Sequence, residues 1–232
     1  MKKLSIILSF FIATLSCQGS ENKTADSLAQ GQQQTKKLKR YDVKSGIVHY
    51  KSTIHGKVLG STVSGTGIED LYFKDWGAIE LTEEKSTKTT HTNVFGKKST
   101  DVSNVHTMSK LDNGESYGVD FDNKMIFLRR DLAMDMTRAF HKNADAGTVG
   151  KSMLEGMGGK KIATEKVLGY TCDVWDVSGA KQWIYKGVVL KLEVTVMGIT
   201  TIKEATSAKF NTTVADSILN FLILKYKKKK VF

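Results

Sequence analysis

The sequence predicts an α+β protein, built from a large antiparallel sheet with two short helices against its apolar face. Segments in which every second residue is apolar recur along the chain, which is typical of strands with one apolar face and one face in water. One central segment has helical periodicity instead. Because this segment lies between two series of about five strands each, we expect the helices to cover one face of a single sheet.

The strand pattern is clearest in residues 48–54, 117–121 and 190–196. Turn signals lie between such segments, at 112–114, 122–123, 178–180, 186–187 and 198. Short turns of this kind join antiparallel neighbours, which predicts a meander. Near Val174 the apolar positions change from even to odd numbers, which indicates a bulge. The glycines of Ser64-Gly-Thr-Gly67 indicate a strand irregularity.

The helical insert covers residues 131–158 and contains two predicted helices. In residues 131–143 apolar side chains recur at every fourth position, and Asp131 can cap the N-terminus. Residues 148–157 carry a second apolar stripe, and Gly158-Gly159 follows as a stop signal. We therefore expect two short amphipathic helices in the middle of the chain.

The N-terminus indicates export. Lys2-Lys3 precedes about a dozen mostly apolar residues, a run too short to span a bilayer but typical of a secretory signal. Leu15-Ser16-Cys17 resembles the lipobox of bacterial lipoproteins, in which the cysteine is lipidated and becomes the first residue of the mature chain. We therefore expect residues 1–17 to be a lipoprotein signal and Cys17 to attach the protein to a membrane. The alternative is an ordinary signal peptide whose cleavage site lies near a cysteine.

Composition predicts one domain behind a tether. Residues 18–40 are polar and contain no aromatic side chain, which is typical of a flexible linker. Residues 41–220 would form the antiparallel-sheet domain, and 221–232 a basic tail. The apolar residues 218–224 leave two possibilities open, an edge strand or a divergent end. Two lysines lie in the signal and five in the tail, so the net charge of +11 falls to +4 elsewhere and gives no support for nucleic-acid binding.

Motifs for catalysis or metal binding are missing from the sequence. The five histidines, His49, His55, His91, His106 and His141, form no HExxH motif or close pair. With Cys17 as an anchor, Cys172 remains alone and is expected to be a small buried side chain. Asp173 and Asp176 flank Trp175, but carboxylates on strands usually face water. We expect no metal, no cofactor and no enzymatic activity.

Together, the lipobox, the meander, the central helical insert and the segment GYTCDVW…KQWIYKGVVLKLEV resemble the lipoprotein-carrier superfamily with the LolA/LolB-like fold, over roughly residues 41–217. They look closest to lipoproteins of that type in Bacteroidota. The resemblance implies a curved, incomplete β-barrel whose concave face holds an apolar cavity under the helices. For an exported, lipid-anchored protein we expect a location in the bacterial cell envelope, at the outer membrane.

Aromatic and methionine side chains are the candidate walls of such a cavity. Four of the eight methionines lie between residues 134 and 157, and methionine suits adaptable apolar surfaces. They would either form a pliable lid over the cavity or simply pack the helices on the sheet. The candidates are Tyr50, Phe73, Tyr117, Phe121, Met134, Met136, Phe140, Met153, Met157, Trp175, Trp183 and Tyr185. We expect a membrane-anchored, non-enzymatic protein that binds an acyl chain or another apolar ligand. The alternative is an envelope module with a filled interior that binds another protein or acts as a sensor.

Overall fold

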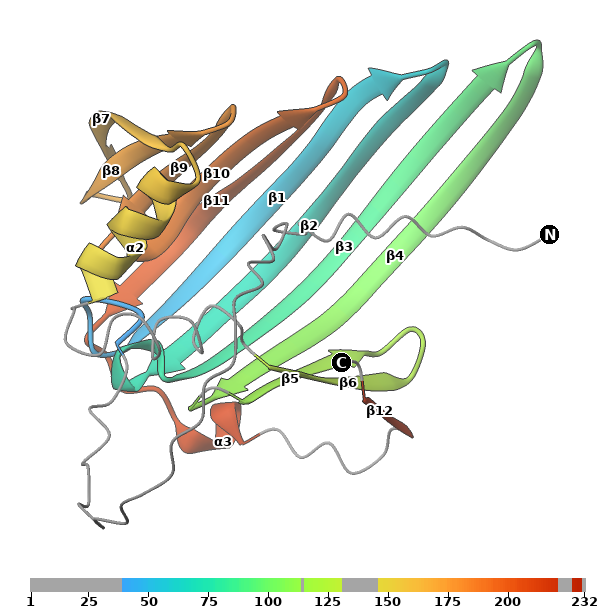
Figure 1. Cartoon of the computed structure of the whole chain (residues 1–232). Coiled ribbons are helices and arrows are strands. Elements are labelled where there is room, and N and C mark those ends of the chain that lie inside the picture. Colours follow the sequence, from blue (N-terminus) through green and yellow to red (C-terminus); the bar gives the residue numbers. More distant parts are fainter. Residues whose placement is uncertain (1–38, 114, 131–145, 221–226, 231–232) are drawn as a thin grey trace, which may run out of the picture. The chain divides into compact units, whose positions relative to one another are not determined.

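Long antiparallel strands dominate the computed structural model, which describes residues 39–113, 115–130, 146–220 and 227–230 (Figure 1). All described residues belong to one compact unit of the chain. The strands are β1 (Gly46–Val58), β2 (Ser61–Lys74), β3 (Ile79–Val94), β4 (Lys97–Asp112), β5 (Glu115–Asp120), β6 (Met125–Arg130), β7 (Lys160–Val167), β8 (Tyr170–Val177), β9 (Ala180–Tyr185), β10 (Val188–Val196), β11 (Ile199–Phe210) and β12 (Lys227–Lys230). A short 3₁₀ turn, η1 (Asp75–Gly77), links β2 to β3.

The twelve strands of the described residues form one open sheet in the order β12-β6-β5-β4-β3-β2-β1-β11-β10-β9-β8-β7. Chain neighbours pair antiparallel along both meanders, and the antiparallel pair of β1 and β11 joins the two. The predicted α+β class with a large antiparallel sheet that does not close into a barrel is therefore confirmed. β12 is the exception, because it pairs parallel with β6 at the sheet edge.

The described helices are α2 (Ala146–Gly156) and α3 (Asp216–Leu219). α2 confirms the helix predicted over 148–157, whereas the helix predicted over 131–143 lies outside the described residues. α3 was not predicted, because only four residues are helical and the apolar run 218–224 was interpreted as an edge strand or a divergent end. None of the described helices has both the length and the apolar character that crossing a membrane requires.

Two core clusters stabilise the sheet, on opposite faces. Val48 and Phe73 belong to the first cluster, whereas their neighbours Ile47 and Tyr72 pack against the second. Successive strand residues point to opposite faces, so β1 and β2 contribute to both clusters at their inner ends. Leu219 of α3 is buried in the second cluster. The sequence predicted a single apolar face, and the structure corrects this: β3 to β6 bury the other face, beneath the segment around α3.

Two local predictions of irregular strands are wrong. Near Val174 the register of β7 and β8 does shift, but the extra residue is Ile162 of β7, and β8 pairs with β9 without a shift, so the strand of Val174 carries no bulge. The irregularity expected at residues 64–67 is wrong: β2 pairs with both neighbours without a register shift throughout this segment. Small residues fit the regular strand there because side chains of adjacent strands lie over them.

Candidate functional site

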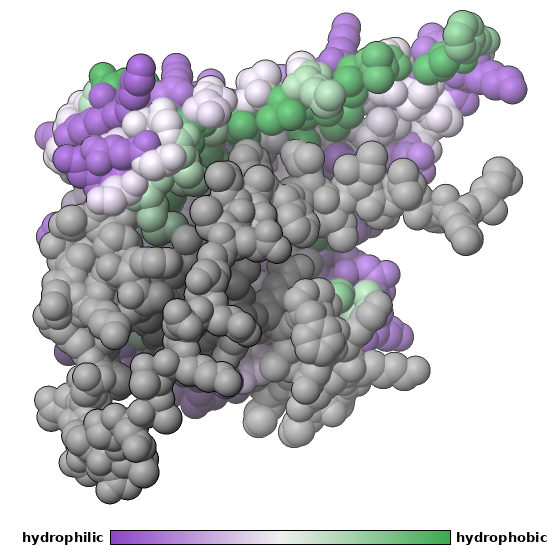
Figure 2. Space-filling model, viewed as in Figure 1, coloured by the Kyte–Doolittle hydropathy of each residue, from purple (hydrophilic) through white to green (hydrophobic). Residues whose placement is uncertain are grey.

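An apolar stripe runs along one face of β10, β11, β1 and β2, from the first core cluster towards the outer ends of these strands. Residues paired across antiparallel strands lie on the same face, so the register defines its members. Val194 pairs with Thr201, which pairs with Ile54, and Val196 pairs with Ile199. The stripe consists of Ile54, Val58, Val63, Leu192, Val194, Val196 and Ile199. Figure 2 shows hydrophobic residues gathered in a band that reaches the outer ends of the long strands.

Most of the apolar stripe is half-buried. Only Val63 is buried, at 6% exposure, while Val196 is 39% exposed. The other five side chains lie between these limits. The stripe therefore keeps apolar surface in contact with solvent along about four rows of the sheet, where a packed core would bury it.

Glycines form the floor of the stripe. Gly56, Gly65 and Gly67 lie on the same face as Ile54, because they pair with or alternate with members of the stripe. An added Cβ at Gly65 would lie 2.7 Å from Cγ2 of Ile54, and one at Gly56 would lie 2.1 Å from the carbonyl oxygen of Gly198. A larger residue at these positions would displace neighbouring atoms. Glycine therefore adds no side-chain atoms of its own to the sheet surface between the apolar side chains.

An ion pair marks the inner end of the stripe. Nζ of Lys203 donates to both carboxylate oxygens of Glu69, at 2.9 and 3.0 Å, and lies 5.0 Å from the ring centroid of Tyr50. The Tyr50 hydroxyl donates to the carbonyl of Val189 at 3.0 Å. Burial raises the pKa of Tyr50 far above its ordinary value, and the Glu69 carboxylate raises it further. Tyr50 is thus a neutral wall, and the ion pair adds no net charge to the stripe.

Aromatic rings continue the same surface beyond Tyr50. Phe73 is fully buried, and its ring centroid lies 4.6 Å from that of Tyr41. The half-buried rings of Tyr170, Tyr185 and Phe210 form a triangle with centroids 4.8, 5.0 and 5.1 Å apart. The aromatic rings and the apolar stripe together provide a long apolar path on one side of β1 and its neighbours.

The structure brings four of the predicted cavity residues together. Tyr50, Phe73 and Trp183 are buried members of the first core cluster, and Tyr185 packs against it. The indole N–H of Trp183 donates to the carboxylate of Glu165 at 2.7 Å, which satisfies its polar atom. These four residues lie at the inner end of the path that the stripe continues.

The other predicted residues lie elsewhere. Trp175 is buried but belongs to neither cluster, and Tyr117 is half-buried with its hydroxyl bonded to Glu115. Phe121 packs against the second cluster, so the two faces of the sheet separate it from Phe73. Two methionines of the insert, Met153 and Met157, are exposed. The remaining predicted site residues lie outside the described residues: Cys17, Met134, Met136 and Phe140.

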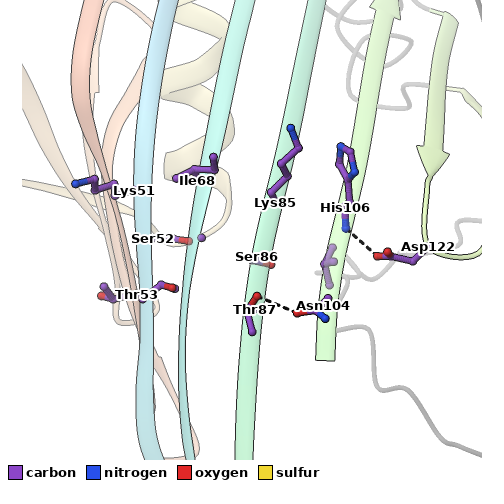
Figure 3. A pocket seen from close by; sticks show the side chains of 13 residues that line it. Lys51, Ser52, Thr53, Ile68, Lys85, Ser86, Thr87, Asn104, His106 and Asp122 are labelled. Atoms are coloured by element: carbon purple, nitrogen blue, oxygen red, sulfur yellow. Dashed lines mark hydrogen bonds between the residues drawn. The ribbon is translucent and has the colours of Figure 1, made fainter. Parts of the chain in front are cut away.

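A polar groove of about 650 Å³ occupies the opposite face of β1 to β4 (Figure 3). Threonine hydroxyls, Lys51, Lys85, Asn104 and His106 line it, together with the apolar residues Ile68 and Val105 and with Asp122 from the turn after β5. Thr87 donates to Asn104 at 2.9 Å, and the backbone N–H of His106 donates to Asp122 at 2.9 Å. These are the bonds drawn in Figure 3. The groove is therefore chemically unlike the apolar cavity that the sequence predicts.

Two basic side chains of the groove, Lys85 and His106, share one carboxylate partner on the same face, Glu83. Oε1 of Glu83 lies 2.8 Å from Nζ of Lys85 and 2.8 Å from Nε2 of His106. The hydrogen bond from Lys85 is the main cause of the lowered pKa of Glu83, and His106 lowers it further. The His106 ring also stacks on Phe121, with centroids 4.1 Å apart. Such mutual pairing is typical of a stable polar surface.

The cysteine and the two aspartates considered as reactive residues are buried or bonded to neighbouring groups. Cys172 is fully buried, and burial raises the pKa of its thiol, which keeps it protonated and unreactive. Asp173 pairs with Lys161 at 2.6 Å, and Asp176 accepts the backbone N–H of Gly179 at 2.9 Å. In the part of the chain that the structure describes, no group of three His, Cys, Asp or Glu side chains could hold a metal ion.

Sequence reasoning missed the stripe, although part of its signal was present. The alternation in residues 190–196 and at Ile54 indicated apolar faces on separate strands. Only the register shows that these faces adjoin and that Gly56 and Gly65 lie between them. The pairing of β1 with β11 joins residues about 150 positions apart, which no local pattern reveals.

Comparisons with known proteins give similarities of fold only. No family model matches the chain, and no curated protein matches it significantly. An uncharacterized conserved protein from Thermus thermophilus has a TM-score of 0.42 at 7% identity, over 79% of this chain and 91% of that one. A domain named for outer membrane lipoprotein sorting, from Vibrio parahaemolyticus, has a TM-score of 0.28 at 10% identity, over 76% and 89%.

A DUF1329 family protein from Desulfovibrio piger has a TM-score of 0.26 at 11% identity, over 77% of this chain and 90% of that one. The lipoprotein-sorting domain is of the kind that the sequence resembles. With TM-scores below 0.5, these similarities carry no argument about function, which rests on the residues of this chain.

Proposed function

We propose that this protein is a non-enzymatic lipoprotein of the bacterial cell envelope, anchored through Cys17 at the outer membrane, that binds an acyl chain or a similar apolar ligand. The ligand lies along the apolar stripe, with its inner end towards Tyr50 and Trp183. The continuous stripe, half-exposed and floored by glycine, is the observation that carries this proposal.

The chemistry of the stripe favours a flexible apolar chain. An extended acyl chain needs a long, narrow apolar surface with few polar groups. The rows from Leu192 to Val196 provide one, in which the polar side chains on the same face are Ser52, Thr201 and the paired Lys203. The stripe spans only a few strands, so it offers no broad flat surface for a globular partner. The Lys203–Glu69 pair at its inner end is internally neutralised, which suits an uncharged chain beside it.

A charge on the stripe is expected to weaken ligand binding strongly. Ile54→Asp places a carboxylate where the chain lies, and burying it under an apolar ligand weakens binding on the order of tenfold or more. The measurement is a titration of the purified protein with a fluorescent monoacylglycerol, which has no charge of its own. Native mass spectrometry of the same samples reports lipid retained during purification.

Thr53→Asp is the matched control. Thr53 is the neighbour of Ile54 on the same strand, but it faces the polar groove and is exposed. Both changes put Asp, a poor strand former, into β1. A loss of binding in Ile54→Asp alone therefore shows that the ligand lies on the face of the sheet that carries Ile54. Equal binding by the two variants would contradict the proposal. A wild-type protein that neither retains nor takes up lipid would favour the alternative, a protein-binding module with a filled interior.

A further inference from the structure

Among the described hairpins that turn at one end of the sheet, the three built from the longest strands end in exposed apolar side chains. The turns after β1, β3 and β10 carry Leu59, Phe95 and Met197, with exposures of 92%, 101% and 83%. The three turns lie at the same end of the sheet (Figure 1). Shorter hairpins that turn at this end carry Ser178 and Lys124 instead. At this end of the sheet, apolar tips thus occur on the three hairpins with the longest strands, whereas Leu168, 47% exposed, lies in a turn at the opposite end.

The backbone joins the three tips to one another. The N–H of Asn93 donates to the carbonyl of Gly60 at 2.9 Å, and the N–H of Lys57 donates to the carbonyl of Gly198 at 3.2 Å. Neighbouring strands are about 4.8 Å apart, so adjacent tips lie roughly 10 Å apart across the sheet. Leu59, Phe95 and Met197 therefore form one row, here called the apolar tips.

Each apolar tip has a backbone conformation that its side chain disfavours. The φ angles of Leu59, Phe95 and Met197 are 44°, 49° and 51°, and glycine follows each residue. Two-residue hairpin turns of this kind favour Asn, Asp or Gly at the first position. Bulky residues at positive φ are uncommon, and such outliers often mark functional sites. Neither local conformation nor packing explains these three side chains.

The residues around the apolar tips are positively charged. Residues 55–63, 91–100 and 195–200 include Lys57, Lys97 and Lys98 and contain no Asp or Glu. Beside Phe95, a depression of about 580 Å³ is lined by Val94, Lys97 and Lys98 together with hydroxyl side chains. Apolar side chains at the centre with lysines beside them are typical of a surface that enters the interface of an anionic membrane.

We propose that the apolar tips insert into the surface of an anionic phospholipid bilayer, while Lys57, Lys97 and Lys98 bind lipid phosphates. A fluid bilayer accommodates three separate protruding side chains, whereas a folded protein partner would need a matching cavity for each. The charge of the flanking lysines complements anionic headgroups. This inference stands independently of the ligand proposed for the apolar stripe, because it concerns only the outer turns.

The test uses the full chain, reconstituted into phosphatidylglycerol vesicles whose acyl chains carry bromine. Phe95→Trp places a fluorophore at the outermost tip, and wild-type protein supplies the signal of the native tryptophans for subtraction. We expect bromine to quench the introduced tip fluorophore at least about twofold more than a tryptophan that stays in water. Reversing Lys97 and Lys98 to Glu in the same variant should weaken insertion on the order of tenfold.

Leu168→Trp is the matched control, because Leu168 also precedes a glycine at positive φ, in a hairpin turn at the opposite end of the sheet. Preferential quenching of the Phe95→Trp variant, lost on charge reversal, supports the proposal. Equal quenching of the Phe95→Trp and Leu168→Trp variants would overturn the proposal. This holds whether the protein is attached to the vesicle through a lipid anchor or through another contact. Quenching of the Phe95→Trp variant that is indifferent to Lys97 and Lys98 would overturn the assignment of these lysines to lipid phosphates.

Discussion

Replacing Phe73 with Ala is expected to destabilise the protein by about 3–5 kcal/mol, the range for deletion of a buried aromatic ring. Phe73 is fully buried, and its ring lies over Gly46, where an added Cβ would be 2.6 Å from Cε1 of Phe73. It also contacts the rings of Tyr41 and Phe210. Since natural domains are stable by about 5–15 kcal/mol, this change removes a large part of the total. Urea unfolding followed by circular dichroism measures it.

Phe95→Ala is the control for this prediction, because it removes the same atoms from a fully exposed position. Surface substitutions usually change stability by less than about 0.5 kcal/mol, and we expect that here. Similar losses for Phe73→Ala and Phe95→Ala would contradict the assignment of the first core cluster, since the cost would then be independent of burial.

The triple change Leu59→Asn, Phe95→Asn and Met197→Asn is expected to stabilise the protein. A non-glycine residue in the left-handed region costs roughly 1–2 kcal/mol, and Asn tolerates this region better than most residues. Asn-Gly is also the preferred sequence for such hairpin turns. We expect a gain of about 1 kcal/mol per turn, or about 3 kcal/mol in all, measured as a higher urea midpoint with an unchanged slope.

The reverse change at Asn113 provides the control. Asn113 also has a positive φ, of 50°, and follows β4 in the turn to β5. Asn113→Leu should destabilise the protein, opposite in sign to the triple variant. A triple variant no more stable than wild type would show that the three side chains stabilise the fold. The structural case for a separate function of the apolar tips would then be lost. A more stable triple variant would support such a function, because functional sites commonly reduce the stability of the fold.

The sequence carried enough local information to predict strands, turns and one helix. Alternation in residues 190–196 corresponds to β10, and the turn signals at 178–180 and 186–187 lie at the ends of β9. The stop at Gly158-Gly159 follows α2, and Gly159 N–H donates to the carbonyl of Leu154 at 2.8 Å. These features depend on neighbours in the chain, so periodicity and turn chemistry reveal them.

Long-range pairing was beyond the reach of sequence patterns. The two core clusters exist because Ile47 and Val48 point to opposite faces, each of which is covered. The coverage by Leu219 depends on a segment about 170 residues further along the chain. The strand of lysines at 227–230 was predicted as a basic tail, because adjacent like charges disfavour a strand in isolation.

Part of the candidate site could also be predicted from the sequence, whereas the rest needed the structure. Tyr50, Phe73, Trp183 and Tyr185 were predicted as aromatic walls and do lie together, yet whether they contact a ligand stays a prediction. The apolar stripe needs the register of four strands to become visible. The apolar tips need the φ angles and exposures, since a Leu-Gly or Phe-Gly pair in the sequence gives no sign of a protruding turn.

Photocrosslinking tests the central claim that one face of the sheet binds an acyl chain. A fatty acid with a photoreactive group along its chain is bound to the full-length protein, irradiated, and its attachment sites are located by peptide mass spectrometry. The account predicts labelling at Ile54, Val63 and Val194, all members of the apolar stripe. Labelling confined to Thr53, Thr66 and Lys85 in the polar groove on the opposite face would contradict it.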